Sequence, residues 1–258
     1  MATSIALTGA AAAALWGLEG FRGHDWQPRS CAPHSERAEA GLLRTRRWQE
    51  PTELGGVPVV RASVALHHVG LEVRRVPRWP GDTVLLGEDE VVELAIEDAL
   101  RRGLATPIDL RIRGGAHASD HLRAVMSRRH GEPPTESFAE TRAMQVLREM
   151  GFAPMWRQMT IIDAGQILHR VDFVLPVRTR KRPPVLLPHH GLLVEVDGRA
   201  AHTAEGAFER DSRRETNYDA LGYAWVAFTP REIERTPAAV AAAVQARLRQ
   251  VPNAGLIY

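Results

Sequence analysis

The sequence predicts an α/β fold for residues 131–258, preceded by a smaller, mainly α or mixed region over residues 1–130. Short apolar runs with the period-two alternation of strands follow one another after residue 150. Amphipathic stretches that end at a glycine, typical of helices, lie before and between these runs. A polar segment that ends in two prolines, Ser127–Pro134, is typical of a linker and separates the two parts.

The sequence of residues 1–130 predicts few helices and strands. A helix is expected over residues 10–18 and a short strand over residues 56–60. Residues 88–102 place their apolar side chains on one side and are followed by a glycine, so they predict an amphipathic helix. Another helix is expected to start at Thr106, because threonine suits the N-cap and the next residue, Pro107, suits the first turn.

The second region has a clearer pattern of helices and strands. Its strands alternate apolar and polar residues, and a turn at residues 163–165 joins the first two into a hairpin. The expected order is a helix over 136–150, strands over 155–162, 167–175 and 192–197, a helix over 205–221, a strand over 223–229 and a last helix from Pro230 to about residue 248.

Three carboxylates fall on the second and third of these strands. Because strand residues alternate faces, Asp172 shares a face with Val174, and Glu195 shares one with Asp197. If the strands are neighbours, the three acids converge at one end of the sheet. Carboxylates that close repel one another unless a cation lies among them, and oxygen ligands suit Mg²⁺ or Mn²⁺.

A fourth acid, Glu140, lies on the helix expected over residues 136–150. At 100° per residue it falls roughly 80° from the centre of the apolar face. A glutamate that only faces solvent is expected on the opposite side, with Gln145 and Glu149. Structural roles stay open for all these acids: a helix-edge glutamate, a solvent-facing or turn-capping Asp172, and a partly buried ion pair of Asp211 with Arg214.

Composition limits the classes of protein. The chain has 33 Lys and Arg against 31 Asp and Glu, a net charge of +2, so any basic surface for nucleic acid is local. Lys181 is the only lysine. The single cysteine, Cys31, excludes an intrachain disulfide and a cysteine-based zinc site. No apolar run approaches the ~20 residues of a membrane helix, and the start has no basic signal-peptide region, so we expect a cytoplasmic protein without membrane association.

The order of several short motifs is more specific than any one of them. These motifs resemble the series in small endonuclease-like proteins related to the very-short-patch repair endonucleases, within the PD-(D/E)XK nuclease superfamily. The likeness covers roughly residues 134–248. It is carried by Ser137-Phe-Ala-Glu140-Thr-Arg142, His169-Arg-Val-Asp172-Phe, Val194-Glu195-Val-Asp197-Gly198-Arg-Ala-Ala-His202, Phe208-Glu-Arg-Asp211-Ser-Arg-Arg214 and Leu221-Gly-Tyr223.

The resemblance implies a restriction-endonuclease-like core: a helix, a three-stranded meander, a helix, a strand and a helix. It implies Glu140, Asp172 and Glu195 as the acidic set, with His202 and Asp211 as auxiliary active-site residues. The superfamily carries a lysine two positions after Glu195, where this chain has Asp197. The repair-endonuclease branch also lacks that lysine, so the departure removes one standard group without excluding activity.

Residues 1–130 resemble, less specifically, the middle region of actinobacterial proteins that join an AbiEi-type antitoxin winged helix to such a nuclease-like domain. The stretches that carry the likeness are residues 13–18, 56–60 and 97–103. The winged helix that normally precedes this region is expected to be absent, either because the chain is a short form or because its start is assigned late. An antitoxin or promoter-binding role therefore stays open.

The leading hypothesis is Mg²⁺- or Mn²⁺-dependent hydrolysis of DNA. Asp172, Glu195 and the carbonyl of Val196 are expected to hold the metal, with Asp197 ligating or supporting it. Glu140 is expected to orient the attacking water or hold a second metal, and His202 to transfer a proton. The expected DNA contacts are Arg178, Arg180, Lys181 and Arg182 in the loop 176–190, and Arg199, Arg213 and Arg214.

Two rival functions stay open. One is a non-catalytic DNA-binding regulator or antitoxin built on a nuclease fold, since fold alone does not secure activity. The other is a protein-interaction module that acts with a partner nuclease or toxin. The sequence also leaves open a homodimer or a partner protein. The loop 176–190 could equally be a solvated surface loop.

Overall fold

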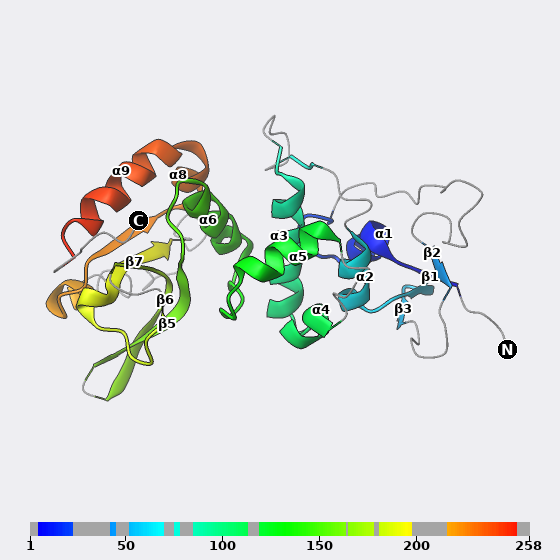
Figure 1. Cartoon of the computed structure of the whole chain (residues 1–258), viewed down its shortest axis with the longest axis horizontal. Coiled ribbons are helices and arrows are strands. Elements are labelled where there is room, and N and C mark those ends of the chain that lie inside the picture. The colour runs from blue at the N-terminus through cyan, green and yellow to red at the C-terminus, as the bar shows by residue number, and fades with distance from the viewer. Residues whose placement is uncertain are drawn as a thin grey trace, which may run out of the picture. The chain divides into compact units, whose positions relative to one another are not determined.

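The computed structural model describes residues 5–22, 42–44, 52–69, 75–77, 85–112, 119–163, 165–177, 181–197 and 216–251. The chain divides into two compact units, Met1–Pro134 and Thr135–Tyr258 (Figure 1). Both units contain helices and strands, so the protein is mixed α/β. Within the ranges just given, none of the helices has the length and apolar composition needed to cross a bilayer.

Unit 1 combines a mixed sheet with helices. Its strand order is β2-β1-β4-β3, in which β1 runs parallel to β4 and the other neighbours are antiparallel. The elements are β1 Ile5–Leu7, α1 Gly9–Leu15, β2 Leu42–Arg44, β3 Thr52–Leu54, β4 Val57–Val59, α2 Ala62–His68, α3 Glu88–Arg101, α4 Pro107–Ile112 and α5 Asp120–Arg128.

The expected helices of unit 1 correspond to α1, α3 and α4, and the expected strand to β4. The pattern gave no sign of β1, β2 and β3, because runs of three residues are too short for alternation to stand out. Helix α3 is more buried than its apolar face suggests. Glu97 on this helix is fully buried and forms an ion pair with the buried Arg129, which follows α5. The pair lets a charged helix face pack inside the unit.

Unit 2 is built around a four-stranded sheet in the order β5-β6-β7-β8. Strands β5, β6 and β7 form an antiparallel meander, and β8 is parallel to β7. The parallel pair requires a crossover, of which residues 216–220 are described and helical. The elements are α6 Phe138–Glu149, β5 Trp156–Asp163, β6 Gln166–Pro176, the 3₁₀ helix η2 Pro188–His190, β7 Gly191–Val196, β8 Trp225–Phe228, α8 Pro230–Arg235 and α9 Pro237–Leu248.

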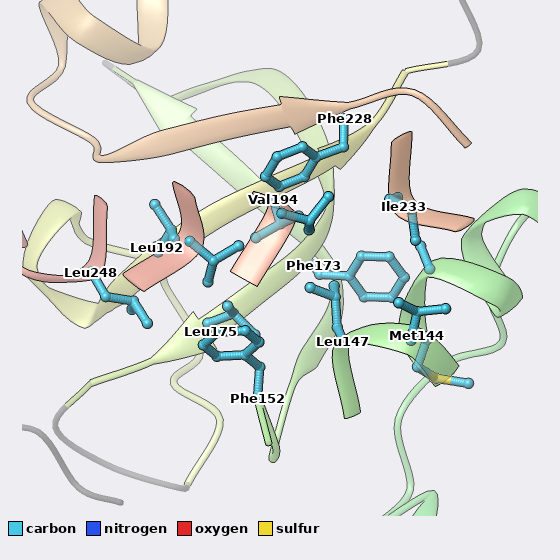
Figure 2. Packing of buried hydrophobic residues seen from close by; sticks show 14 of the residues in the cluster. Met144, Leu147, Phe152, Phe173, Leu175, Leu192, Val194, Phe228, Ile233 and Leu248 are labelled. Carbon is cyan, nitrogen blue, oxygen red and sulfur yellow. The ribbon is translucent and has the colours of Figure 1, made fainter. Parts of the chain in front are cut away.

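One face of this sheet packs against α6, α8 and α9 (Figure 2). Alternate residues of the central strands, Phe173 and Leu175 on β6 with Leu192 and Val194 on β7, point into this cluster and are 0–4 % exposed. Burying a side chain of this size stabilises a fold by about 1.5–3 kcal/mol. The cluster therefore fixes the register of β6 and β7, and with it the places of the polar residues that follow.

The expectation of one continuous helix from Pro230 to residue 248 is wrong. The segment forms two helices, α8 and α9, which meet at Thr236 with φ −130° and ψ 50°. Pro237 explains the break, because its ring disfavours the helical conformation of the residue before it and its nitrogen donates no hydrogen bond.

The expectation that Gln145 faces solvent is also wrong. Gln145 is fully buried and accepts a hydrogen bond from Arg142, whose guanidinium also bonds to Glu234 of α8. The Arg142 Nε to Glu234 Oε1 distance is 2.8 Å, and both side chains are about 97 % buried or more. Helix α6 is therefore covered on its polar side as well, where α8 supplies the partner charge that the sequence pattern of α6 alone does not reveal.

The opposite face of the sheet carries a second cluster, and here the alternation of strand faces is interrupted. Trp156 and Met159 both pack in this cluster, although strict alternation would put residues three apart on opposite faces. The same holds for Val171 and Val174, their partners in the register. Both strands therefore change face at one level of the hairpin, between the pairs Arg157–Phe173 and Met159–Val171.

Candidate active site

The residues at this interrupted level are Gln158 on β5 and Asp172 on β6. Gln158 has φ +51°, a left-handed conformation that is uncommon for residues other than glycine. Such irregularities re-aim side chains and are common next to active sites. The groups that act on Asp172 come from β7 and α6, so the interruption lies where the acids meet.

Asp172 and Glu195 approach each other across β6 and β7. The register pairs Phe173 with Val194, so the next step along the antiparallel strands brings Asp172 opposite Glu195. The Asp172 Oδ2 atom accepts a hydrogen bond of 2.8 Å from the backbone N–H of Val196. This backbone contact holds the Asp172 carboxyl at the carboxyl end of β7.

The environment of Asp172 favours its neutral form. Burial raises its pKa first, and the charges of Glu195 and Glu140 raise it further, to about 8 from a usual value of 3.8. The hydrogen bond from Val196 acts in the opposite direction but is outweighed. At neutral pH and without a cation, the cluster is therefore expected to hold a proton.

Glu140 reaches the cluster from the first turn of α6. Ser137 is the N-cap, and its hydroxyl accepts from the Glu140 N–H at 3.1 Å. The Glu140 carboxylate in turn accepts from the Ser137 hydroxyl and from the Glu136 N–H, at 2.9 and 2.8 Å. It also accepts from the Gln158 amide at 2.9 Å. Glu140 thus closes the helix start, as in a capping box, and ties it to β5 beside Asp172.

Glu195 is held from its other side. It is only 3 % exposed, and its Oε1 atom accepts a hydrogen bond of 2.5 Å from the buried hydroxyl of Tyr218. The Nε2 atom of His169 lies 3.2 Å from the same oxygen. The His169 and Tyr218 rings meet edge to face, with centroids 5.9 Å apart. A histidine and a tyrosine therefore flank one oxygen of this buried carboxylate.

The two other expected ligands lie at the end of β7. Val196 is partly buried, and its backbone N–H donates to Asp172. The atom expected to bind the metal was its carbonyl oxygen. Asp197 is 7 % exposed, and its backbone N–H donates to the Phe228 carbonyl at 2.8 Å. This bond continues the pairing of β7 with β8, so Asp197 is fixed within the sheet rather than in a loose turn.

The donor set suits a hard divalent cation in type, although the acids are not arranged as a finished metal site. Among the described residues, no three His, Cys, Asp or Glu side chains lie in an arrangement that would hold a metal ion. Asp172 and Glu195 offer adjacent carboxylate oxygens, the ligands that Mg²⁺ and Mn²⁺ prefer. Burial and the charges of Glu195 and Glu140 raise the pKa of Asp172, and this resistance to ionisation is the observation that fits a cation.

The expected DNA-contacting residues fall partly outside the described residues. Lys181 is exposed. Arg182 donates from Nη1 to the carbonyl of Arg157 at 2.9 Å and so ties its loop to β5. His202 and Asp211, expected as auxiliary catalytic residues, and the expected DNA contacts Arg178, Arg180, Arg199, Arg213 and Arg214 lie outside the described residues.

Three residues of the site were not anticipated: Gln158, His169 and Tyr218. The capping pattern Ser137-x-x-Glu140 is a sequence signal that would have explained part of the burial of Glu140. Tyr218 offered no such signal, because its contact with Glu195 joins the crossover helix to β7. The role of Gln158 was equally hidden, because it depends on a left-handed backbone conformation that glutamine rarely adopts.

No protein-family model, curated protein or solved structure matches this chain.

Proposed function

We propose that this protein is a metal-dependent endonuclease that hydrolyses phosphodiester bonds in DNA. The observation that carries the proposal is the meeting of Asp172 with Glu195 beside Glu140 in a buried position. Burial first, and then the charges of these two acids, raise the pKa of Asp172 to about 8. A buried group of acids is costly unless a proton or a cation lies among them. Hydrolysis of phosphodiesters is a reaction for which such a bound cation is suited.

The order of elements supports the same proposal. A helix, an antiparallel meander, a crossover and a parallel fourth strand are expected for a restriction-endonuclease-like core, and α6, β5–β7 and β8 follow this order. The acids lie on α6, β6 and β7, the elements that carry the motifs resembling the PD-(D/E)XK superfamily. We therefore propose that unit 2 is a nuclease domain of the kind related to very-short-patch repair endonucleases.

Each acid has its own part in the proposed reaction. A bound Mg²⁺ or Mn²⁺ would polarise the scissile phosphate and lower the pKa of a water molecule. Asp172 and Glu195 would hold the ion through carboxylate oxygens, and the Val196 carbonyl oxygen would be a further ligand. Glu140, fixed by its capping hydrogen bonds, would orient the attacking water. His202 would supply the proton to the leaving group.

A cleavage assay tests the proposal directly. The purified protein is incubated with supercoiled plasmid and with single-stranded DNA in Mg²⁺ or Mn²⁺, and EDTA serves as the metal-free control. We expect metal-dependent nicking that Asp172→Asn and Glu195→Gln abolish. Glu149→Gln is the matched control, because it neutralises an exposed acid at the far end of α6 and is expected to retain full activity.

The other outcomes identify the rival functions. DNA binding without cleavage, unchanged by Glu195→Gln, would replace the nuclease with a non-catalytic DNA-binding regulator. The presence of Asp197 where the superfamily has lysine is the feature of the chain that favours this outcome. A protein that neither cleaves nor binds DNA would instead point to an interaction module.

A further inference from the structure

The contact between Tyr218 and Glu195 joins two parts of unit 2 that are distant in sequence. Tyr218 lies in the described end of the crossover helix, residues 216–220, and Glu195 lies on β7. The tyrosine is 2 % exposed and packs in the cluster with Trp156 and Leu193. Its hydroxyl can therefore hardly leave Glu195 without repacking that cluster.

The hydrogen bond is of a strong kind. Its donor–acceptor distance of 2.5 Å is typical of a hydroxyl that donates to an ionised carboxylate, and the pair is buried. The Nε2 atom of His169 lies 3.2 Å from the same Oε1 atom. The Tyr218 hydroxyl thus fixes the position of Oε1, with the His169 ring beside it, so rotation of the carboxylate about its last bond is restricted.

We propose that Tyr218 is a positioning residue that presents Glu195 to the cation through its Oε2 atom. With Oε1 engaged by Tyr218 and flanked by His169, Oε2 is the oxygen by which Glu195 would share a cation with Asp172. Partners of this kind orient metal ligands, and their loss typically weakens metal affinity 10–100-fold. This inference rests on the proposed function, since it concerns the same carboxylates.

The chain offers a matched control for the test. Tyr223 is also buried in this cluster, and its hydroxyl donates to the Leu186 carbonyl at 2.8 Å instead of to a carboxylate. Tyr218→Phe and Tyr223→Phe therefore each remove one buried hydroxyl and its hydrogen bond. Only Tyr218→Phe removes the donor to Glu195.

The measurement is Mn²⁺ binding to the full chain, from the electron paramagnetic resonance signal of the free ion. We expect Tyr218→Phe to raise the Kd for Mn²⁺ about tenfold and Tyr223→Phe to leave it unchanged. DNA nicking by Tyr218→Phe should need correspondingly more Mn²⁺ for half-maximal rate and approach the wild-type rate at saturation. A merely structural tyrosine would not give this split.

The outcomes separate the inference from the proposed function. If the wild-type protein binds Mn²⁺ and nicks DNA while Tyr218→Phe matches it at every Mn²⁺ concentration, the positioning role is wrong and the nuclease stands. If the wild-type protein binds no Mn²⁺, both are wrong. Should Tyr218→Phe unfold, Tyr218→Met, which also removes the hydroxyl that donates to Glu195, takes its place, and a Kd for Mn²⁺ equal to that of the wild type would overturn the role.

Discussion

Asp172 and Glu195 lie next to each other on antiparallel strands, and the backbone N–H that holds Asp172 belongs to Val196, the residue after Glu195. The strand that supplies one acid therefore also fixes the other. Burial and the neighbouring carboxylates disfavour ionisation of Asp172 in this arrangement, and they raise its pKa.

Asp172 should make unit 2 less stable as the pH rises. Its folded-state pKa of about 8 lies above the unfolded value near 3.8, so the folded protein holds a proton that the unfolded chain has lost between these limits. The free energy of unfolding therefore falls as the pH rises through this window and levels off above about pH 8. Asp172→Asn removes the titration, and Asn can still accept from the Val196 N–H.

Thermal unfolding in EDTA at pH 5 to 9 measures this effect. The melting temperature of Asp172→Asn minus that of the wild type should increase with pH and then stay constant. Other titrating groups affect both proteins alike, so the difference isolates the cluster. A difference that is constant over the whole range would contradict the raised pKa.

Two variants should distinguish the structural role of Glu140 from its catalytic role. Glu140→Gln can keep all three hydrogen bonds, because its amide oxygen accepts from Glu136 and Gln158 and its amide group donates to Ser137. We expect it to melt like the wild type and to nick DNA at least about tenfold more slowly. Glu140→Ala also loses the helix cap and should cost about 1–2 kcal/mol of stability. Equal nicking by Glu140→Gln would reduce Glu140 to a capping residue.

The sequence predicted the order of helices and strands in unit 2 and placed Asp172 and Glu195 on its second and third strands, because alternation and glycine stops are local signals. The helix break at Pro237 was not predicted, although the sequence carried its signal, since the residue before a proline avoids the helical conformation. Burial of Gln145 was not readable, because its partner Arg142 pairs with Glu234, which lies on another helix far along the chain. The same holds for Tyr218, whose carboxylate partner lies on another element.

Asp172 and Glu195 lie close together, as expected. The strict alternation of strand faces from which this was expected does not hold, however. Both β5 and β6 change face at Gln158 and Asp172, which no periodicity of two reveals. Most of the short strands of unit 1 were not predicted, for a different reason. Each has three residues, so its pairing is decided by neighbours rather than by its own pattern.

Position 191 should require glycine because there is no room for a Cβ atom, and not because of its backbone conformation. Its φ of 174° is extended backbone that any residue adopts, but a Cβ atom there would lie 2.3 Å from the Leu175 carbonyl oxygen. Relief needs movement of the β6–β7 pairing at the start of the strand that carries Glu195. Gly191→Ala should therefore destabilise the protein by about 1–3 kcal/mol in chemical denaturation. An unchanged denaturation midpoint would show that the strands separate freely here.

The buried pair of Arg142 and Glu234 should be costly to break and cheap to replace. Glu234→Gln removes the carboxylate charge that the buried guanidinium faces, so a loss of about 3–5 kcal/mol is expected. The double variant Arg142→Met, Glu234→Leu removes both charges and should recover most of that loss. Unfolding free energies of the single and double variants test this. A double variant less stable than Glu234→Gln would mean that the pair stabilises the contact of α6 with α8.

Gln158 should reverse the usual preference for β-branched residues in strands. At φ +51°, valine pays a steric penalty that glycine avoids, so Gln158→Val is expected to be about 1–2 kcal/mol less stable than Gln158→Gly. Both variants lose the hydrogen bond to Glu140, so their difference isolates the backbone. In an ordinary strand, valine would be the more stable of the two. If denaturant unfolding finds valine more stable here, the left-handed conformation at Gln158 is not required, and Glu140 must be held beside Asp172 by its capping hydrogen bonds alone.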